Sequence, residues 1–357
     1  FRGVRLFAWA GVREKLHSLA ACMVARGTLL PTCWILAANS WLHTPRGHVM
    51  VDGVLQVASW REVIFNPSFP YRLVHMTLAS FLTTCFVIGG VAGWYLRKGV
   101  HLDPARRMLR LATAFACIVV PLQIVVGDLH GLNTLEHQPA KVAAIEAHWR
   151  QGATGEGVPL VVWAIPDEQA ERNHQAVEVP RLGSLVLTHT WDGHVPALGD
   201  IARDERPPVK PVFYAFRLMV GIGMLMLVLA LTSAWIWWRG ALATRRWLHL
   251  AWNLMLPAGF VAIIAGWFVT EIGRQPYVVY GLLRTSEAAS PVGAASVAAS
   301  LAVYVVAYAV VFGFGTTYLY RMLRRGPLPH EPEPRTEGGE RTPARPISAS
   351  DASLEGG

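Results

Sequence analysis

The sequence is short of charged residues and of cysteine, and each shortage narrows what the protein can be. Charged residues make up 16% of the chain, whereas hydrophobic residues make up 53% and 14 residues are tryptophan. This balance is typical of a membrane protein. The four cysteines lie in apolar stretches and show neither CxxC nor Cys/His spacing, which argues against a zinc or thiol redox motif and favours packing roles. They are Cys22, Cys33, Cys85 and Cys117.

Six apolar runs are long enough to cross about 30 Å of hydrocarbon at about 1.5 Å per residue. They predict an all-α membrane protein, a helical bundle of about six transmembrane helices. The runs are Ser18–Asn39, Leu73–Leu96, Leu111–Val126, Val212–Trp238, Leu248–Thr270 and Pro291–Tyr320. Arg26 and Pro31 interrupt the first run, which makes it the weakest. Pro121 lies within the third, where neighbouring helices can accommodate it.

Lysine and arginine are unevenly shared between the two sets of helix ends. Most lie near residues 2–15, 97–110, 239–246 and 321–325, whereas the opposite short loops hold few. Since basic residues stay on the cytoplasmic side, both termini are expected there and the long segment from Asp128 to Pro211 outside. The formal charge of +8 then reflects membrane topology and not a nucleic-acid partner.

This topology divides the chain into four expected parts. Residues 1–127 hold three transmembrane helices with a short external hairpin and helix, and residues 128–211 form a long external loop. Residues 212–325 hold the last three transmembrane helices. Residues 326–357 are rich in Pro, Glu, Arg, Gly and Ser, and we expect a disordered cytoplasmic tail.

Three local patterns predict structure outside the membrane. Residues 49–57 are two short apolar stretches about Asp52-Gly53, which predicts a hairpin. Ser59 and Glu62 match a capping box, which predicts a short helix. Residues 140–149, AKVAAIEAHW, have helical spacing.

Two side chains are candidate ligands of a haem iron. His75 and Met219 lie a few residues inside the second and fourth apolar runs, and both of these helices enter from the outside, so the two side chains are expected at a similar depth. A histidine and a methionine can together ligate one electron-transfer haem. Arg217, two residues before Met219, suits a haem propionate. The alternative is a hydrogen-bonded packing histidine and an ordinary core methionine.

Ionisable residues also end the fifth run. Glu271 and Arg274 lie where this helix meets water, in the string GRQP that follows GWFVTEI, and an ordinary helix-end ion pair is the alternative to a functional site there.

Five blocks together resemble subunit I of the cytochrome bd-type quinol oxidases, within its short-loop, cyanide-insensitive branch. The resemblance covers roughly residues 16–325. The blocks, in order, are WILAANSWLHTP, FNPSFPYRLVHMTLASF, GDLHGLNTLEHQPAKVAAIEAHW, FYAFRLMVGIG and GWFVTEIGRQPYVVYGLLRT.

The resemblance implies roles for individual residues. His75 and Met219 look like the axial ligands of a low-spin haem b, and Glu271 like the ligand of a high-spin haem b. Lys141 and Glu146 look like the pair implicated in quinol oxidation. Arg217, Arg274 and Trp267 look like residues that line the haems.

The resemblance also implies an enzyme, partners and a location. Such an oxidase passes electrons from quinol through haem b toward a haem d, or a substitute haem, where oxygen is reduced to water. It works in the bacterial inner membrane with a subunit II, a small membrane subunit and ubiquinol or menaquinol. Independently of the family, a quinol site needs a base for the two released protons, which Glu146 offers. A solvated helix with unrelated charges is the alternative for Lys141 and Glu146.

The chain departs from the family pattern before its first block. The family has three further helices there, with a histidine ligand of haem d, and no matching block precedes Phe1. His17, at a cytoplasmic helix end, and His43, expected past Asn39 in an external loop, do not replace that ligand. We interpret the chain as a piece of a longer subunit; the alternative is a truncated relative that keeps only the quinol and low-spin haem half.

Two other classes of function stay open on sequence grounds. In a membrane transporter or assembly subunit without redox activity, His75, Glu271 and Arg274 would line a substrate path. In a haem b membrane anchor for a dehydrogenase, the haem ligands would act without quinol turnover at Lys141 and Glu146.

Overall fold

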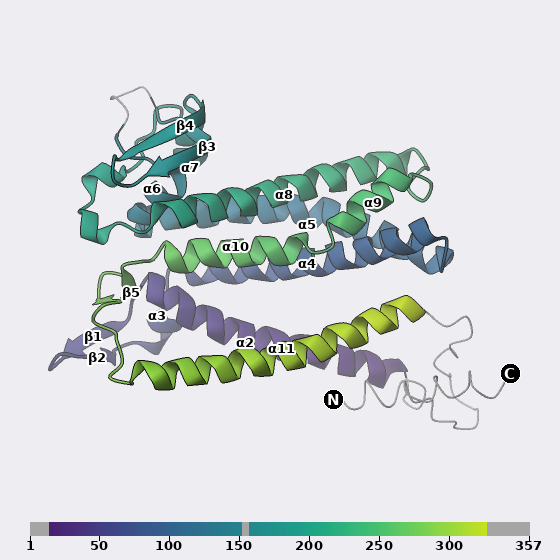
Figure 1. Ribbon diagram of the computed structural model, residues 1–357, viewed down its shortest axis with the longest axis horizontal. Coiled ribbons are helices and arrows are strands. Elements are labelled where there is room, and N and C mark those ends of the chain that lie inside the picture. The colour runs from purple at the N-terminus through teal and green to yellow at the C-terminus, as the bar shows by residue number, and fades with distance from the viewer. Residues whose placement is uncertain (1–13, 152–156, 327–357) are drawn as a thin grey trace. The chain divides into compact units, whose positions relative to one another are not determined.

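The computed structural model describes residues 14–151 and 157–326 (Figure 1). Apart from its first residue, the predicted disordered tail lies outside the described residues. The chain divides into two compact units, one of residues 37–317 and one of residues 1–36 with 318–357. The larger unit holds every candidate site residue.

The predicted all-α membrane fold is confirmed. Six helices of the described residues are long and apolar enough to cross a membrane, and they overlap the six predicted runs. They span Ser18–His43, Phe69–Lys98, Leu102–His137, Val209–Trp238, Arg246–Ile272 and Ala294–Arg325. The first is the greater part of α2 (Glu14–His43), which continues through Pro31, and the last is α11, which has no buried residue.

Four of these spans pack into one bundle within the larger unit. Helix α4 (Phe69–Lys98) packs against α5 (Leu102–His137), α9 (Arg246–Leu254) and α10 (Ala258–Ile272), and α8 (Val209–Trp238) packs against α5 and α10. The core holds apolar side chains from all of them, including Phe86, Leu109, Leu248 and Trp252. Thus α4 and α8 each contact the same two helices, α5 and α10.

Glycines let α4 and α9 approach closely. A Cβ on Gly93 would lie 2.5 Å from the backbone oxygen of His249, and a Cβ on Gly89 would overlap the ring of Trp252. Trp252 stacks on Phe86 with ring centroids 5.0 Å apart and donates its Nε1 hydrogen to Ser233 Oγ at 2.9 Å. The buried indole therefore has both an apolar and a polar partner.

The third and fifth predicted runs each contain a proline, and the two behave differently in the structure. The fifth span is interrupted after Leu254, and α10 begins directly after Pro257, because proline has no N–H for the helical ladder. Helix α5 continues through Pro121 to His137, so the first ten residues of the segment expected to form the external loop are helical.

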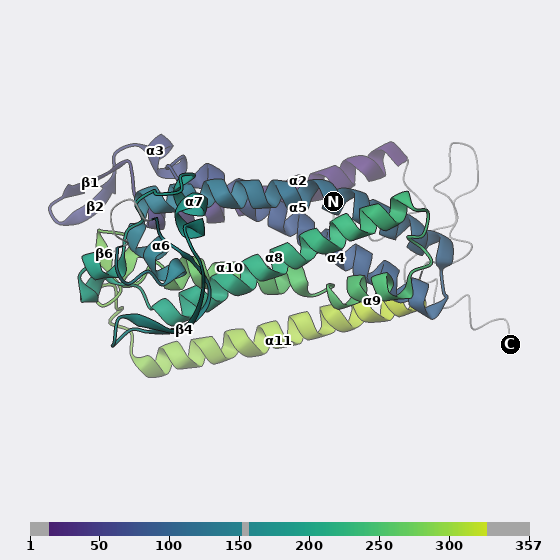
Figure 2. The same cartoon turned by 90° about the horizontal axis from the view of Figure 1, so that it is seen from above.

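Short elements gather at one end of the bundle, where α4 and α8 begin and α10 ends (Figures 1 and 2). They are β1 (His48–Val51), β2 (Val54–Val57), α3 (Trp60–Ile64), α6 (Pro139–Glu146), β3 (Leu160–Asp167), β4 (Arg172–Val179), α7 (Leu182–Thr188), β5 (Tyr277–Val279) and β6 (Leu283–Arg284), with 3-10 turns at Leu198–Asp200 and Arg203–Glu205. The strands form three antiparallel pairs. We refer to this as the loop end of the bundle.

The local patterns predicted part of the loop end correctly. The hairpin about Asp52-Gly53 is β1–β2, paired from His48 with Val57 to Val51 with Val54. Ser59 caps α3, and its Oγ accepts the Glu62 N–H at 3.4 Å. The helical pattern from Ala140 gives α6, which ends at Glu146 because Ala147 is left-handed, with φ 52°.

Candidate functional site

Helix α6 brings Lys141 and Glu146 into the protein interior. Every residue from Ala140 to Glu146 is buried, because the small apolar residues of α6 pack against Val212 and Phe213 of α8. Lys141 and Glu146 are each 3% exposed. This is not the solvated helix that was the alternative for this pair.

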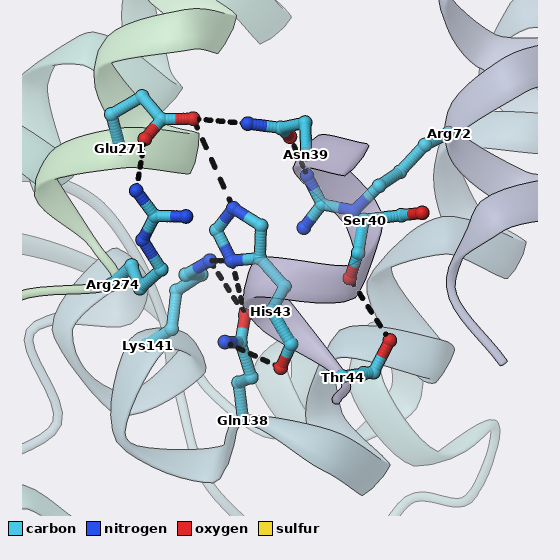
Figure 3. Close-up of polar contacts among 9 residues, drawn as sticks. All are labelled: Asn39, Ser40, His43, Thr44, Arg72, Gln138, Lys141, Glu271 and Arg274. Carbon is cyan, nitrogen blue, oxygen red and sulfur yellow. Dashed lines mark hydrogen bonds and ion pairs between the residues drawn. The ribbon is translucent and has the colours of Figure 1, made fainter. Parts of the chain in front are cut away.

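Lys141 contacts two acceptors, one at the start of its own helix and one from α2. Its Nζ lies 2.6 Å from Gln138 Oε1 and 3.0 Å from His43 Nδ1 (Figure 3). Burial lowers the pKa of Lys141 well below its usual value, and the charges of Arg72 and Arg274 lower it further. The amine is therefore held in a region that already carries positive charge.

The expectation that His43 lies in an external loop is wrong. His43 is the last residue of α2 and is 1% exposed. Its Nδ1 faces Lys141 and Gln138, and its Nε2 lies 3.9 Å from Glu271 Oε1 without a hydrogen-bond partner. The helix ends one turn later than the apolar run, since the polar residues of this turn are buried by neighbouring elements.

Glu271 is held by two partners, one in the turn that follows its own helix and one on α2. Its Oε2 accepts from Arg274 Nη2 at 2.6 Å, and its Oε1 accepts from Asn39 Nδ2 at 2.7 Å (Figure 3). Asn39 Oδ1 in turn accepts from Arg72 Nη1 at 3.1 Å. Asn39 therefore links a carboxylate of α10 to a guanidinium of α4.

The ion pair of Glu271 and Arg274 is more than an ordinary helix end. Arg274 is 7% exposed, and burial lowers its pKa while Glu271 opposes that effect. Its Nε and Nη1 have no hydrogen-bond partner in the described structure. Arg274 of the GRQP string therefore belongs to the same buried polar cluster as Glu271, Lys141 and His43.

Glu146 points away from this cluster, toward α8. Its Oε2 accepts from Arg217 Nη2 at 2.9 Å, and the same guanidinium donates to the backbone oxygens of Ile145 and Val161. Arg217 also lies 3.8 Å above the ring centroid of Phe213. The guanidinium that was expected at a haem propionate thus ties α8 to α6 and β3.

His75 and Met219 lie near the loop end on α4 and α8, the two helices that share α5 and α10 as neighbours. His75 is contacted by the amide of Gln123, whose Nε2 lies 3.2 Å from His75 Nε2. Met219 Sδ faces Gly266, just before the half-buried Trp267 of α10.

The surroundings of these two residues suit a haem. A Cβ on Gly127 would lie 3.4 Å from the His75 ring, and one on Gly266 would lie 3.0 Å from Met219 Sδ, so glycine leaves room beside both candidate ligands. The donor set, an imidazole and a thioether, is one that haem iron accepts. The residues present therefore fit the group.

The sequence reasoning missed four side chains of the loop end: Asn39, Arg72, Gln138 and His130. The ring of His130 lies 5.5 Å from that of His75, and its Nε2 is buried without a hydrogen-bond partner. One signal was available, since Asn39 and His43 are four residues apart and so share a helix face.

The sequence and the fold have counterparts among known proteins. A family model described as cytochrome bd terminal oxidase subunit I matches residues 1–327. The chain belongs to this family. Members of this family bind haems. The relatives of this chain are oxidoreductases that act on quinol.

Individual relatives agree with this assignment. The chain is 28% identical to subunit 1 of the cytochrome bd-II ubiquinol oxidase of Escherichia coli (strain K12), over 94% of this chain and 78% of the relative. It is also 28% identical to subunit 1 of the cytochrome bd ubiquinol oxidase of Bacillus subtilis (strain 168), over 91% of this chain and 71% of the relative. Among solved structures, the bd oxidase from Geobacillus thermodenitrificans matches with a TM-score of 0.81 and 31% identity, over 91% of this chain and 74% of that chain.

Proposed function

We propose that this chain is the quinol-oxidising subunit of a short-loop cytochrome bd-type oxidase in a bacterial inner membrane. Quinol is oxidised at the loop end of the bundle, and its electrons pass to haem b and onward to oxygen. One observation carries the proposal. Arg217, two residues before Met219, forms an ion pair with Glu146 on α6. A base suited to quinol is thus attached to the helix that carries a candidate iron ligand.

The side chains of this site have separate roles in quinol oxidation. Oxidising a quinol releases two protons, so a base must lie beside a hydroxyl group. Glu146 is that base, and Arg217 orients its carboxylate. Lys141 binds the other quinol oxygen, and the acceptors His43 and Gln138 fix the position of its amine.

Three groups of residues hold the cofactors. His75 and Met219 would ligate the iron of a low-spin haem b, and Glu271 would ligate that of a high-spin haem b. Arg274 and Trp267 line the haem sites. When bound, haem supplies a one-electron acceptor whose potential a thioether ligand raises.

The complete oxidase requires more than this chain. A haem d or a substitute haem serves the oxygen site, and a subunit II, a small membrane subunit and lipid surround the bundle. The loop end faces the periplasm and both chain ends face the cytoplasm. Protons from quinol therefore leave on the outside.

The test is a reduced-minus-oxidised absorption spectrum of the protein purified in detergent with its co-expressed partners. A haem b band should be present, should disappear in His75→Ala and should weaken in Met219→Leu. Met224→Leu, a matched control on the exposed face of α8, should keep the band. A colourless wild type would support the transporter or assembly reading instead.

A second measurement separates an oxidase from a haem-carrying anchor. Glu146→Gln should slow reduction of the haem by quinol while the band after chemical reduction stays unchanged. Equal rates of quinol reduction in wild type and Glu146→Gln would favour the anchor.

A further inference from the structure

Several buried side-chain nitrogens at the loop end have no hydrogen-bond partner within the described residues. They are Arg72 Nε, Arg274 Nε and Nη1, His43 Nε2 and His130 Nε2. Buried polar groups in native proteins are nearly always paired, and the guanidinium nitrogens can only donate, so these unpaired groups indicate a missing acceptor.

Arg72 is the most informative of these donors. It is 7% exposed, and its guanidinium donates from Nη1 to the neutral amide of Asn39. Within the described structure no carboxylate forms an ion pair with it. A buried guanidinium is normally paired with an anion, since leaving the charge unpaired in a low dielectric is costly.

The whole cluster has too much positive charge for its carboxylates. Arg72 and Arg274 are both at least nine-tenths buried, and Glu271, the carboxylate beside them, is already held by Arg274 and Asn39. Further anionic oxygens are therefore needed at this place.

The position of Arg72 points to the source of those oxygens. Arg72 precedes His75 by three residues, so the two side chains share a face of α4 one turn apart. His130 of α5, with its own unpartnered Nε2, lies against the His75 ring. Two buried nitrogens without a partner thus flank the candidate iron ligand.

We propose that Arg72 and His130 bind a carboxylate of the haem whose iron His75 ligates. This carboxylate is a propionate, because a haem carries two propionate groups on its edge. Arg72 binds it through Nε, and His130 donates to it from Nε2. The inference rests on the proposed function, since it requires a haem at His75.

The experiment is a redox titration of the low-spin haem b in the purified oxidase, for wild type, Arg72→Gln, Arg72→Lys and His130→Leu. A buried positive charge near the haem favours the reduced form, so Arg72→Gln should lower the midpoint potential. We expect a shift of about tenfold in the ferric to ferrous ratio, or about 59 mV for one electron. Arg72→Lys keeps the charge and should shift the potential less, whereas His130→Leu should lose haem faster on dilution.

Arg61→Gln is the matched control, because it removes an equal charge from an exposed arginine of α3 at the same end of the protein. It should leave the potential unchanged. If Arg72→Gln does not fold, Arg72→Lys and His130→Leu test the proposal instead. Haem retention and a midpoint potential equal to wild type in both variants would overturn it.

Two further results of these measurements would contradict the proposal or the function on which it rests. An unchanged potential in Arg72→Gln with a raised KM for quinol would show that Arg72 serves the substrate, which contradicts the proposal. A wild type without haem b would defeat the proposed function itself, whereas a wild type with haem b and an unresponsive Arg72→Gln would defeat this inference alone.

Discussion

Arg217 Nη2 and Glu146 Oε2 lie 2.9 Å apart and join α8 to α6. The pair is largely buried, with side chains 16% and 4% exposed. Removing either partner leaves the other charge in a poorly solvated place, whereas removing both does not. The two side chains should therefore act as a unit.

The first prediction concerns this pair. Glu146→Gln should lower the turnover of quinol by at least about 100-fold, because general-base catalysis contributes about 10²–10⁴-fold. Arg217→Gln should lower it as well, and the double variant should be no worse than the more damaged single variant. Turnover with quinol is measured for all four proteins as a double-mutant cycle. Strictly additive losses would mean that the two residues act separately.

The second prediction concerns Lys141 and pH. Its pKa is lowered in the folded protein, while an unfolded lysine has a pKa of about 10.4. Between these two values the unfolded chain binds one more proton than the folded chain, so this group makes stability rise with pH and fall as the pH drops. Relative to Lys141→Met, wild type should therefore gain thermal stability from pH 7 to pH 10.

Lys210→Met is the control for this measurement, because Lys210 is an exposed lysine at the start of α8. Its unfolding midpoint should follow that of wild type across the same pH range. A wild type and Lys141→Met with parallel pH profiles would show that Lys141 keeps an ordinary charge when folded.

The third prediction concerns His43. In His43→Leu the Lys141 amine loses one of its two acceptors, a loss worth about 1 kcal/mol, and the KM for quinol should rise by about fivefold while turnover changes little. His43→Gln, whose amide can accept from Lys141, should restore most of the affinity. His194→Leu, an exposed histidine of the same loop region, should behave as wild type. A fall in turnover with unchanged KM would argue against a positioning role.

Local patterns in the sequence predicted the parts of this fold that local physics determines. Apolar runs gave the spans, Asp52-Gly53 gave the β1–β2 turn, and Ser59 gave the start of α3. The break before α10 was not predicted, although Pro257 lies there, whereas Pro121 was expected to be accommodated and α5 continues through it. Whether a proline breaks a helix depends on tertiary packing, and the length of an apolar run does not reveal that packing.

The candidate site was predictable only in part for a related reason. Lys141, Glu146, Glu271 and Arg274 came from a family resemblance and from their place at helix ends, and their roles stay predictions. The contacts of Asn39 with Glu271, and of His43 with Lys141, join residues 232 and 98 positions apart. Pairings this distant arise when helices assemble, so neither the extension of α2 to His43 nor the partners of Asn39 and His43 could be predicted from local patterns.

The last prediction concerns the core. A Cβ on Gly89 would overlap the buried ring of Trp252, which is also fixed by Phe86 and Ser233. Gly89→Ala should therefore destabilise the bundle by about 1–3 kcal/mol, the usual cost of overpacking, despite the better helix propensity of alanine. Thermal unfolding in detergent, followed by tryptophan fluorescence, measures this.

Gly223→Ala provides the matched comparison, because a Cβ at that position of α8 meets nothing within 4 Å. There the change should be neutral or stabilising by up to about 1 kcal/mol, since only helix propensity acts. Equal unfolding midpoints for the two variants would mean that α9 moves away from α4 at little cost. The close approach at Gly89 would then not contribute to holding the two helices together.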